Sequence, residues 1–190
     1  MKMEKTSKEC NLLCSGPSRK SYIPNDLPTM GCNIPWTKVD WTIIFDSIVL
    51  EKIIDNPDFV SIDTKLIVSS HAIGEIKEKG KLKDLNHNII SIYRYNPITT
   101  RLMKKSTGHY AAEWLIFMGY NKINIYGCNN WFGDLYCTEN YMHDSSNPLN
   151  IENENIPRGE KYMINRGKHW KKYWEKLIAH HSHVHFNFIP

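Results

Sequence analysis

The sequence predicts an α/β protein built on a doubly wound, mostly parallel, Rossmann-like sheet of about seven strands. Short apolar runs rich in β-branched and aromatic residues alternate along the chain with stretches of helical periodicity. Such alternation is expected when buried parallel strands are joined by crossover helices. The chain has 190 residues, of which 41% are hydrophobic and 23% charged, so it can bury an ordinary core. We therefore expect a polar tail over 1–9 and a single Rossmann-like domain over 10–190.

Each expected element is supported by its own run of residues. The strands are the apolar runs 11–14, 30–33, 41–45, 66–69, 89–95, 122–126 and 184–189. A short helix is expected over 47–54, before a break at Asn56-Pro57, and a longer one over 107–118, which ends at Gly119. The last helix, over 168–180, carries aromatic and aliphatic residues on one face. The polar segment 127–161 has no sustained period, which predicts a long lid-like loop before that helix.

The composition of the chain indicates in which cellular compartment the protein works and which classes of ligand it can bind. The net charge of +4 permits a phosphate-bearing ligand without demanding a nucleic acid. No run approaches the roughly 18 apolar residues of a membrane span, so we expect a cytoplasmic protein. The chain has 19 Lys against 5 Arg, a bias typical of AT-rich coding DNA, which suggests a phage or similar source and then the host cytoplasm. Five cysteines without a C-x-x-C pair predict reduced thiols rather than a zinc ribbon or a disulfide framework.

The first candidate binding loop is Ser15, Gly16, Pro17 and Ser18, directly after the first strand. In a doubly wound sheet the ligand lies beyond the carboxyl ends of the strands. A loop of small residues there lets backbone N–H groups and hydroxyls approach a phosphate closely. The alternative is an ordinary turn between strand and loop.

Two further polar residues follow the next strands. Asn33 comes after the second strand and Asp46 after the third, so both are expected at the same edge of the sheet. There they could hydrogen-bond a nucleobase or a ribose. The alternative for Asn33 is a turn, and for Asp46 it is the N-cap of the helix that follows.

The start of the helix over 107–118 is a candidate anion site. Ser106, Thr107 and Gly108 expose N–H groups at the positive end of the helix dipole, beside Lys104 and Lys105. His109 could point into the same site. The alternative is a Ser or Thr N-cap with His109 packed beside it.

The segment after the sixth strand holds the remaining candidates for the ligand site. Asn129 follows Gly127 at the tip of that strand, and Tyr136 and Tyr141 lie on the lid-like segment, from which they could close over a ligand. The alternative is ordinary loop chemistry, with aromatic residues anchoring the loop.

Histidines supply the candidate catalytic base. His169, expected at the start of the last helix, could act as a general base when neutral, or could be a surface residue. His181, His183 and His185 alternate as in a strand, so their rings would share one face. Without accompanying carboxylates we expect a polar strand edge there and no metal site.

The motifs together resemble the bacterial sialyltransferases of the lipooligosaccharide type and a broader set of related Rossmann-like proteins, which includes predicted glycosyltransferases and pterin pyrophosphokinases. The matching segments are 15–18, 32–33, 106–110 and 119–127. The resemblance implies nucleotide binding by Ser15–Ser18, Asn33 and Ser106–Gly108, phosphate contacts from Tyr136 and Tyr141, and His169 as the base. Cys14-Ser15, where that family favours Asn, and Asp46 depart from the pattern, which leaves the donor nucleotide and sugar open.

The expected function is therefore transfer from a nucleotide-activated donor, by an inverting glycosyltransferase that uses a CMP- or UDP-linked sugar. No metal or other cofactor is obligatory in this interpretation, the acceptor is unknown, and a modified nucleobase or an oligomeric assembly stays open. The alternatives are a protein that binds or sequesters nucleotides without turnover, a pyrophosphokinase of the pterin type, and a nucleic-acid-binding module. A pyrophosphokinase would need carboxylates for Mg²⁺, and Asp46 with Asp134 or Asp144 are the candidates.

Overall fold

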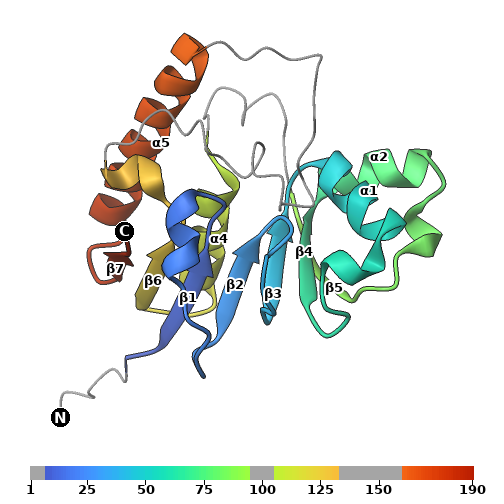
Figure 1. Ribbon diagram of the computed structural model, residues 1–190, viewed down its shortest axis with the longest axis horizontal. Helices are drawn as coiled ribbons and strands as arrows, with labels where there is room; N and C mark the ends of the chain where they lie inside the picture. Colours follow the sequence, from blue (N-terminus) through green and yellow to red (C-terminus); the bar gives the residue numbers. More distant parts are fainter. Residues whose placement is uncertain (1–6, 95–104, 133–159) are drawn as a thin grey trace.

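A computed structural model describes residues 7–94, 105–132 and 160–190 (Figure 1). Seven parallel strands form one sheet in the order β5-β4-β3-β2-β1-β6-β7, which confirms the predicted α/β fold. The strands are β1 (Glu9–Leu13), β2 (Thr29–Cys32), β3 (Trp41–Ile44), β4 (Lys65–Ser69), β5 (Ile89–Tyr93), β6 (Lys122–Tyr126) and β7 (His185–Phe188).

The strand order creates a topological switch point between β1 and β6. The chain adds β2 to β5 one after another on one side of β1, and then returns to place β6 on its other side. Connections leave β1 and β6 in opposite directions at this point, which opens the crevice where doubly wound folds bind ligands. The carboxyl ends of β1 and β6 are therefore where the candidate residues have to be examined.

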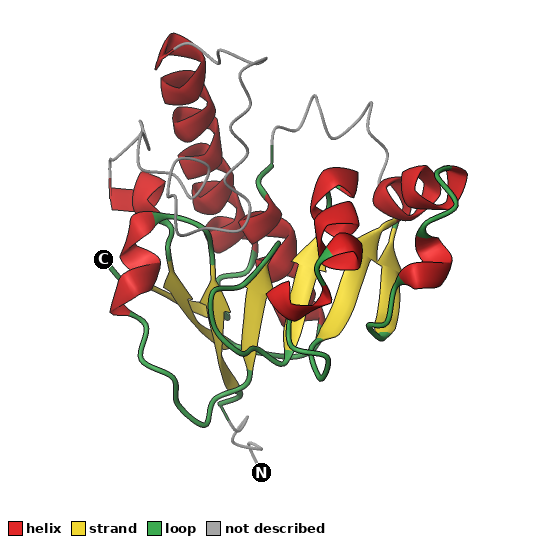
Figure 2. Cartoon of the chain, turned by 45° about the vertical axis from the view of Figure 1, so that its right-hand side comes forward, coloured by secondary structure: helices red, strands yellow, loops and turns green. Residues whose placement is uncertain are grey.

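Helices cover both faces of the sheet because successive strand residues point to opposite sides. Ile43 packs in the core beneath α4 (Thr107–Phe117) and α5 (Glu160–His180), whereas Ile44 packs beneath α1 (Ser47–Asp55) and α2 (Ser70–Glu78). Four short 3-10 helices complete the described elements: η1 (Pro17–Ser21), η2 (Pro57–Phe59), η3 (Leu82–Asp84) and η4 (Asn129–Phe132). In both views the amino-terminal part of α5 projects beyond the edge where the strands end (Figure 2).

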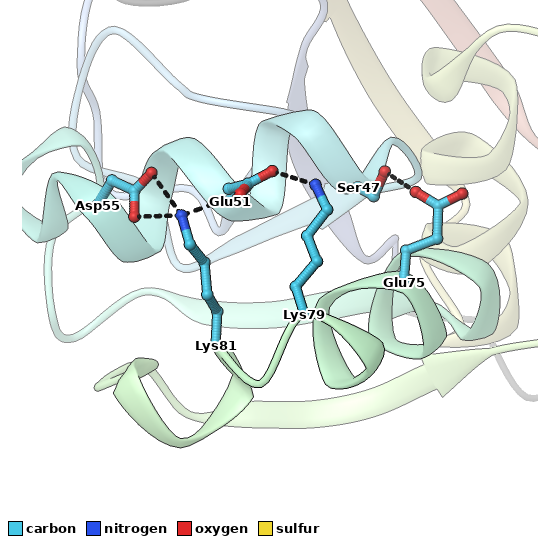
Figure 3. A network of polar contacts seen from close by, with 6 residues as sticks. All are labelled: Ser47, Glu51, Asp55, Glu75, Lys79 and Lys81. Atoms are coloured by element: carbon cyan, nitrogen blue, oxygen red, sulfur yellow. Dashed lines mark hydrogen bonds and ion pairs between the residues drawn. The ribbon is translucent and has the colours of Figure 1, made fainter.

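The helices α1 and α2 are joined by a network of polar side chains (Figure 3). Glu51 accepts from Lys79 at 2.6 Å and pairs with Lys81 at 2.9 Å, and these two lysines lower the pKa of Glu51. Lys81 also pairs with Asp55 at 3.0 Å, while Ser47 hydrogen-bonds Glu75 at the other end of the network. Because these groups are partly exposed to solvent, each ion pair contributes little to stability.

Some sequence predictions of elements were wrong. The helix α2 was not predicted, because only two of its nine residues, Ala72 and Ile76, are buried and most of the other seven are polar or charged. The last helix begins at Glu160, eight positions before the predicted start, so 160–161 are helical rather than part of a lid. β1 begins at Glu9, within the segment predicted as a tail. His181 and His183 lie in the turn after α5, outside β7, so they do not share a strand face with His185.

Candidate functional site

The loops after β1 and β6 are bonded to each other across the switch point. The Gly16 N–H donates to the Gly127 carbonyl oxygen at 2.8 Å, and the Cys14 N–H donates to the Tyr126 carbonyl oxygen at 2.8 Å. The approach is so close that a Cβ on Gly127 would lie 2.5 Å from the Cys14 carbonyl oxygen. Gly127 also has a φ of +72°, a conformation that favours glycine. Glycine is therefore needed at this position to join the two loops.

Ser18 and Asn129, both predicted to bind nucleotide, complete this junction. The Ser18 N–H donates to Oδ1 of Asn129 at 3.0 Å, and the Ser18 hydroxyl oxygen accepts from the Gly127 N–H at 3.1 Å. The backbone N–H groups of Gly16 and Ser18 thus have protein partners. Pro17, which has no N–H, begins η1. In this loop the Ser15 side chain is half-buried, and its hydroxyl has no hydrogen bond within 7–94, 105–132 and 160–190.

Asn130 follows Asn129 at the tip of β6, where the sequence placed both asparagines near a substrate but only Asn129 among the nucleotide-binding residues. Its side chain is 8% exposed, and its Oδ1 accepts from the Cys128 thiol at 3.5 Å. Its Nδ2 has no hydrogen-bond partner among the residues that the structure describes. A buried amide without a partner costs about 1–3 kcal/mol, and such groups commonly mark ligand sites. The tandem Asn129-Asn130 was a signal for both residues, but sequence could not tell which one joins the loops.

Asn33 lies where it was predicted, directly after β2 at the carboxyl edge. Its φ of +62° makes it the one non-glycine residue with positive φ in the described chain, a conformation that asparagine tolerates better than most residues. Its N–H donates to the Ile43 carbonyl oxygen at 2.9 Å, and its own carbonyl oxygen accepts from the Thr42 hydroxyl at 2.8 Å. These backbone bonds hold the turn and fix the direction of the side chain.

Asp46 is exposed at the end of β3 and precedes the first residue of α1. Its carbonyl oxygen accepts from the Val49 and Leu50 N–H groups, but its carboxylate makes no capping hydrogen bond. Asp46 is therefore the N-cap residue of α1, as the alternative expected, although its cap is made by the backbone and not by the carboxylate.

The start of α4 is closed by its own residues. Nδ1 of His109 accepts from the Ser106 N–H at 3.0 Å, which makes Nε2 the protonated nitrogen, and Nε2 donates to the Trp170 carbonyl oxygen at 3.0 Å. The prediction that His109 could point into an anion site was wrong, because both ring nitrogens have partners and the side chain is 1% exposed. Lys105 pairs with Glu113 at 2.6 Å, so it is no unpaired cation.

At the first turn of α4, Thr107 is half-buried and Gly108 is buried. The Thr107 hydroxyl has no hydrogen bond in the part of the chain that the structure describes. A Cβ on Gly108 would lie 2.8 Å from Sγ of Cys14, so this turn packs directly against the residue before Ser15. The first turn of α4 therefore lies next to the loop that follows β1.

His109 predicts an acid-sensitive stability. Burial lowers the pKa of His109 to about 4, whereas an unfolded histidine titrates near 6.5. The unfolded chain therefore binds the extra proton between these values, so stability is lost as the pH falls from about 6.5 to about 4, by at most about 3 kcal/mol.

Urea unfolding at a series of pH values checks this. The free energy of unfolding of His109→Gln should fall less steeply over that interval than that of the wild type, while the exposed His183→Gln should follow the wild type. Equal slopes for His109→Gln and the wild type would contradict the assignment.

His169 is exposed in the middle of α5, not at its start as predicted. Its Nδ1 lies 2.6 Å from the Asn165 carbonyl oxygen, so Nδ1 carries the proton and donates it. This tautomer leaves the lone pair of Nε2 available to accept a proton. Trp170, the next residue, bonds His109 at the start of α4, and Nζ of Lys171 lies 5.9 Å from the ring centre of Trp131 in η4. The helical turn that carries His169 thus contacts elements on both sides of the switch point.

Several predicted residues fall outside the described residues: Tyr136 and Tyr141 of the lid-like segment, and Asp134 and Asp144. Within the described ranges, no cluster of three or more His, Cys, Asp or Glu side chains could hold a metal ion. None of the described helices has both the length and the apolar content that crossing a membrane requires.

No protein-family model matches the sequence, and no curated protein matches it. Among solved structures, the chain is similar to the sialyltransferase CstII from Campylobacter jejuni, described in complex with the substrate analogue CMP-3FNeuAc. The sequence identity is 13%, the TM-score is 0.49, and the match covers 95% of this chain and 79% of that chain. With so few identical residues, the function has to be argued from the site of this chain itself.

Proposed function

We propose that this protein is an inverting glycosyltransferase that takes a nucleotide-activated sugar, with His169 as the base. The observation that carries the proposal is the fixed tautomer of His169, whose Nδ1 is held by the Asn165 carbonyl oxygen while Nε2 is left to accept a proton. A general base needs this arrangement, and the helical turn that presents it adjoins the start of α4 and η4 at the switch point.

The donor would bind along the carboxyl edge of β2, β1 and β6. The first turn of α4 and the hydroxyls of Ser15 and Thr107 would hold the phosphate. Asn33 and Asn130 would bind the base or ribose through their amides, and Asp46 is a further candidate at the same edge. The proposal of a CMP- or UDP-linked sugar rests on the resemblance of the motifs to those of sialyltransferases, and this interpretation requires no metal.

The reaction would proceed by direct displacement. Nε2 of His169 takes the proton of an acceptor hydroxyl while its oxygen attacks the anomeric carbon of the sugar. The bond between that carbon and the phosphate oxygen breaks, and the nucleotide leaves with the electron pair. The positive end of the α4 dipole stabilises the charge that develops on the phosphate. A base on one side and an anion site on the other give inversion at the anomeric carbon.

Nucleotide binding tests the site. CMP or UDP should raise the melting temperature of the protein in a saturable way, because the ligand binds the folded state. Asn130→Ala should weaken that binding roughly tenfold, as expected for the loss of one hydrogen bond to a polar ligand.

Asn88→Ala is the matched control, since Asn88 is an exposed asparagine just before β5, at the amino-terminal edge of the sheet. It should bind as the wild type does. A wild-type affinity in Asn130→Ala, or the failure of every nucleotide to shift the melting temperature, would refute this site.

A further inference from the structure

Three cysteine side chains gather under the proposed site. Cys14 directly follows β1, Cys32 is the last residue of β2, and Cys128 follows β6 by two positions. All three thiols lie at or against the same core cluster. Cys32 hydrogen-bonds Cys14, and Cys128 is close enough to influence the titration of Cys32. This concentration of sulfur at the switch point plays no part in the proposed transfer reaction.

Cys14 and Cys32 are neighbours across two parallel strands. The register of β1 and β2 pairs Leu13 with Gly31, so the next pair along the strands is Cys14 and Cys32. Adjacent strands lie roughly 4.8 Å apart. That separation falls within the roughly 4.4–6.8 Å between Cα atoms that a disulfide spans. A bond between the two sulfur atoms therefore requires only local adjustment of the strand ends.

The thiols of Cys14 and Cys32 differ in their exposure to solvent. Cys32 is 5% exposed, and its hydrogen bond with Cys14, together with burial, raises the pKa of the Cys32 thiol well above its ordinary value. Cys14 is half-buried, whereas Cys10, Cys32 and Cys128 are buried. Reagents from solution would therefore reach Cys14 first among the described cysteines, with Cys32 in contact behind it.

We propose that Cys14 and Cys32 form a redox-sensitive pair, which a hydroperoxide converts into a disulfide at the base of the nucleotide site. The sulfur of Cys14 attacks the peroxide and the O–O bond breaks, which gives a sulfenic acid and one molecule of water or alcohol. The sulfur of Cys32 then attacks the sulfur of Cys14, and the hydroxyl group leaves with the Cys32 proton as water. The two thiols supply the two electrons that reduce the peroxide.

The disulfide should disturb nucleotide binding, an expectation that rests on the proposed function. Cys14 immediately precedes Ser15, and Cys32 immediately precedes Asn33 with its strained backbone. Bonded sulfur atoms lie roughly 2.05 Å apart, well inside the distance of a hydrogen-bonded contact. The sulfur of Cys14 also packs against Gly108, so drawing it toward Cys32 shifts its contact with the first turn of α4. We expect nucleotide affinity to fall at least fivefold.

Peptide mapping by mass spectrometry tests the pair on the full chain. The protein is treated with hydrogen peroxide, digested without reduction and compared with the untreated sample. The expected product is a peptide that links Cys14 to Cys32, lighter by two hydrogen atoms and lost on reduction. Cys14→Ser and Cys32→Ser should each abolish it, and Cys14→Ala and Cys32→Ala repeat the test if a serine variant fails to fold. Cys10→Ser, which changes a buried thiol elsewhere in β1, should retain it.

Other products overturn the proposal. A link from Cys14 to Cys128, oxidation that stops at a Cys14 acid, or no modification at all would each do so. Nucleotide titration of the reduced and oxidised protein then distinguishes failure of the redox proposal from failure of the proposed function. An unchanged affinity in the disulfide form refutes only the coupling to the site. The absence of nucleotide binding in both forms refutes the proposed function, while the linked peptide still decides the redox pair.

Discussion

Replacement of His169 by glutamine is expected to lower kcat for release of CMP or UDP from its sugar conjugate by roughly 10²- to 10⁴-fold. This corresponds to an activation barrier about 3–5 kcal/mol higher. Glutamine keeps a side-chain amide of similar length, but it cannot accept the proton of the attacking hydroxyl. Nucleotide affinity should stay as in the wild type, because His169 acts on the acceptor. The measurement is the initial rate of nucleotide release with a panel of glycan acceptors, or with water alone.

The matched control is His180→Gln. His180 is an exposed histidine of the same helix, in its last turn, and its replacement should leave kcat unchanged. A His169→Gln protein that turns over as fast as the wild type would refute His169 as the base. Nucleotide binding by the wild type without cleavage of any donor would instead favour a protein that sequesters nucleotides.

Replacement of Gly127 by alanine should lower the free energy of unfolding by about 4 kcal/mol, near the upper end for single substitutions. Two unfavourable contributions to the folding free energy combine at residue 127. A left-handed backbone costs an L-residue about 1–2 kcal/mol, and the new Cβ would lie 2.5 Å from the Cys14 carbonyl oxygen, where backbone has to move. The junction of the β1 and β6 loops would open, so nucleotide affinity should fall as well.

Gly80→Ala separates the two costs. Gly80 has the same φ of +72°, but a Cβ there meets no atom within 4 Å. Urea unfolding of this variant should therefore reveal only the backbone cost, about 1 kcal/mol. The difference between the two variants measures the close approach of the loops. Equal losses for Gly127→Ala and Gly80→Ala would mean that the loops do not meet as described.

The central strands could be predicted because each is a buried apolar run whose ends are set by polar or turn residues. The run over 122–126 matches β6 at both ends, since Asn121 and Gly127 bound it. The helix α2 and the start of α5 were harder to predict from the sequence. The helix α2 buries few residues and contains few apolar ones, so no apolar run drew attention to it. The start of α5 was missed because the apolar residues among its first eight, 162–164, are consecutive instead of helically spaced, and a glycine follows at 167.

That the candidate residues lie at one edge of the sheet could be predicted, but their hydrogen-bond partners could not. Polar residues after successive strands had to meet at one edge, which placed Asn33, Asp46 and the Ser15–Ser18 loop. Ser18 and Asn129 are 111 positions apart, so their hydrogen bond depends on the register of β1 and β6. That register is set by the tertiary fold. The same holds for the hydrogen bond between His109 and Trp170, which are 61 positions apart. Sequence therefore identified groups able to bind a ligand without showing which of them the fold engages.

Titration of the isotope-labelled protein with CMP and with UDP, followed through its backbone and side-chain amide NMR resonances, tests the central claim most directly. The account predicts saturable shifts for one of the two nucleotides, largest at Ser15, Asn33, Thr107 and the side chain of Asn130. Resonances of the network between α1 and α2 should stay unchanged. Saturable shifts centred away from the carboxyl ends of β1, β2 and β6, or no shifts with either nucleotide, would contradict it.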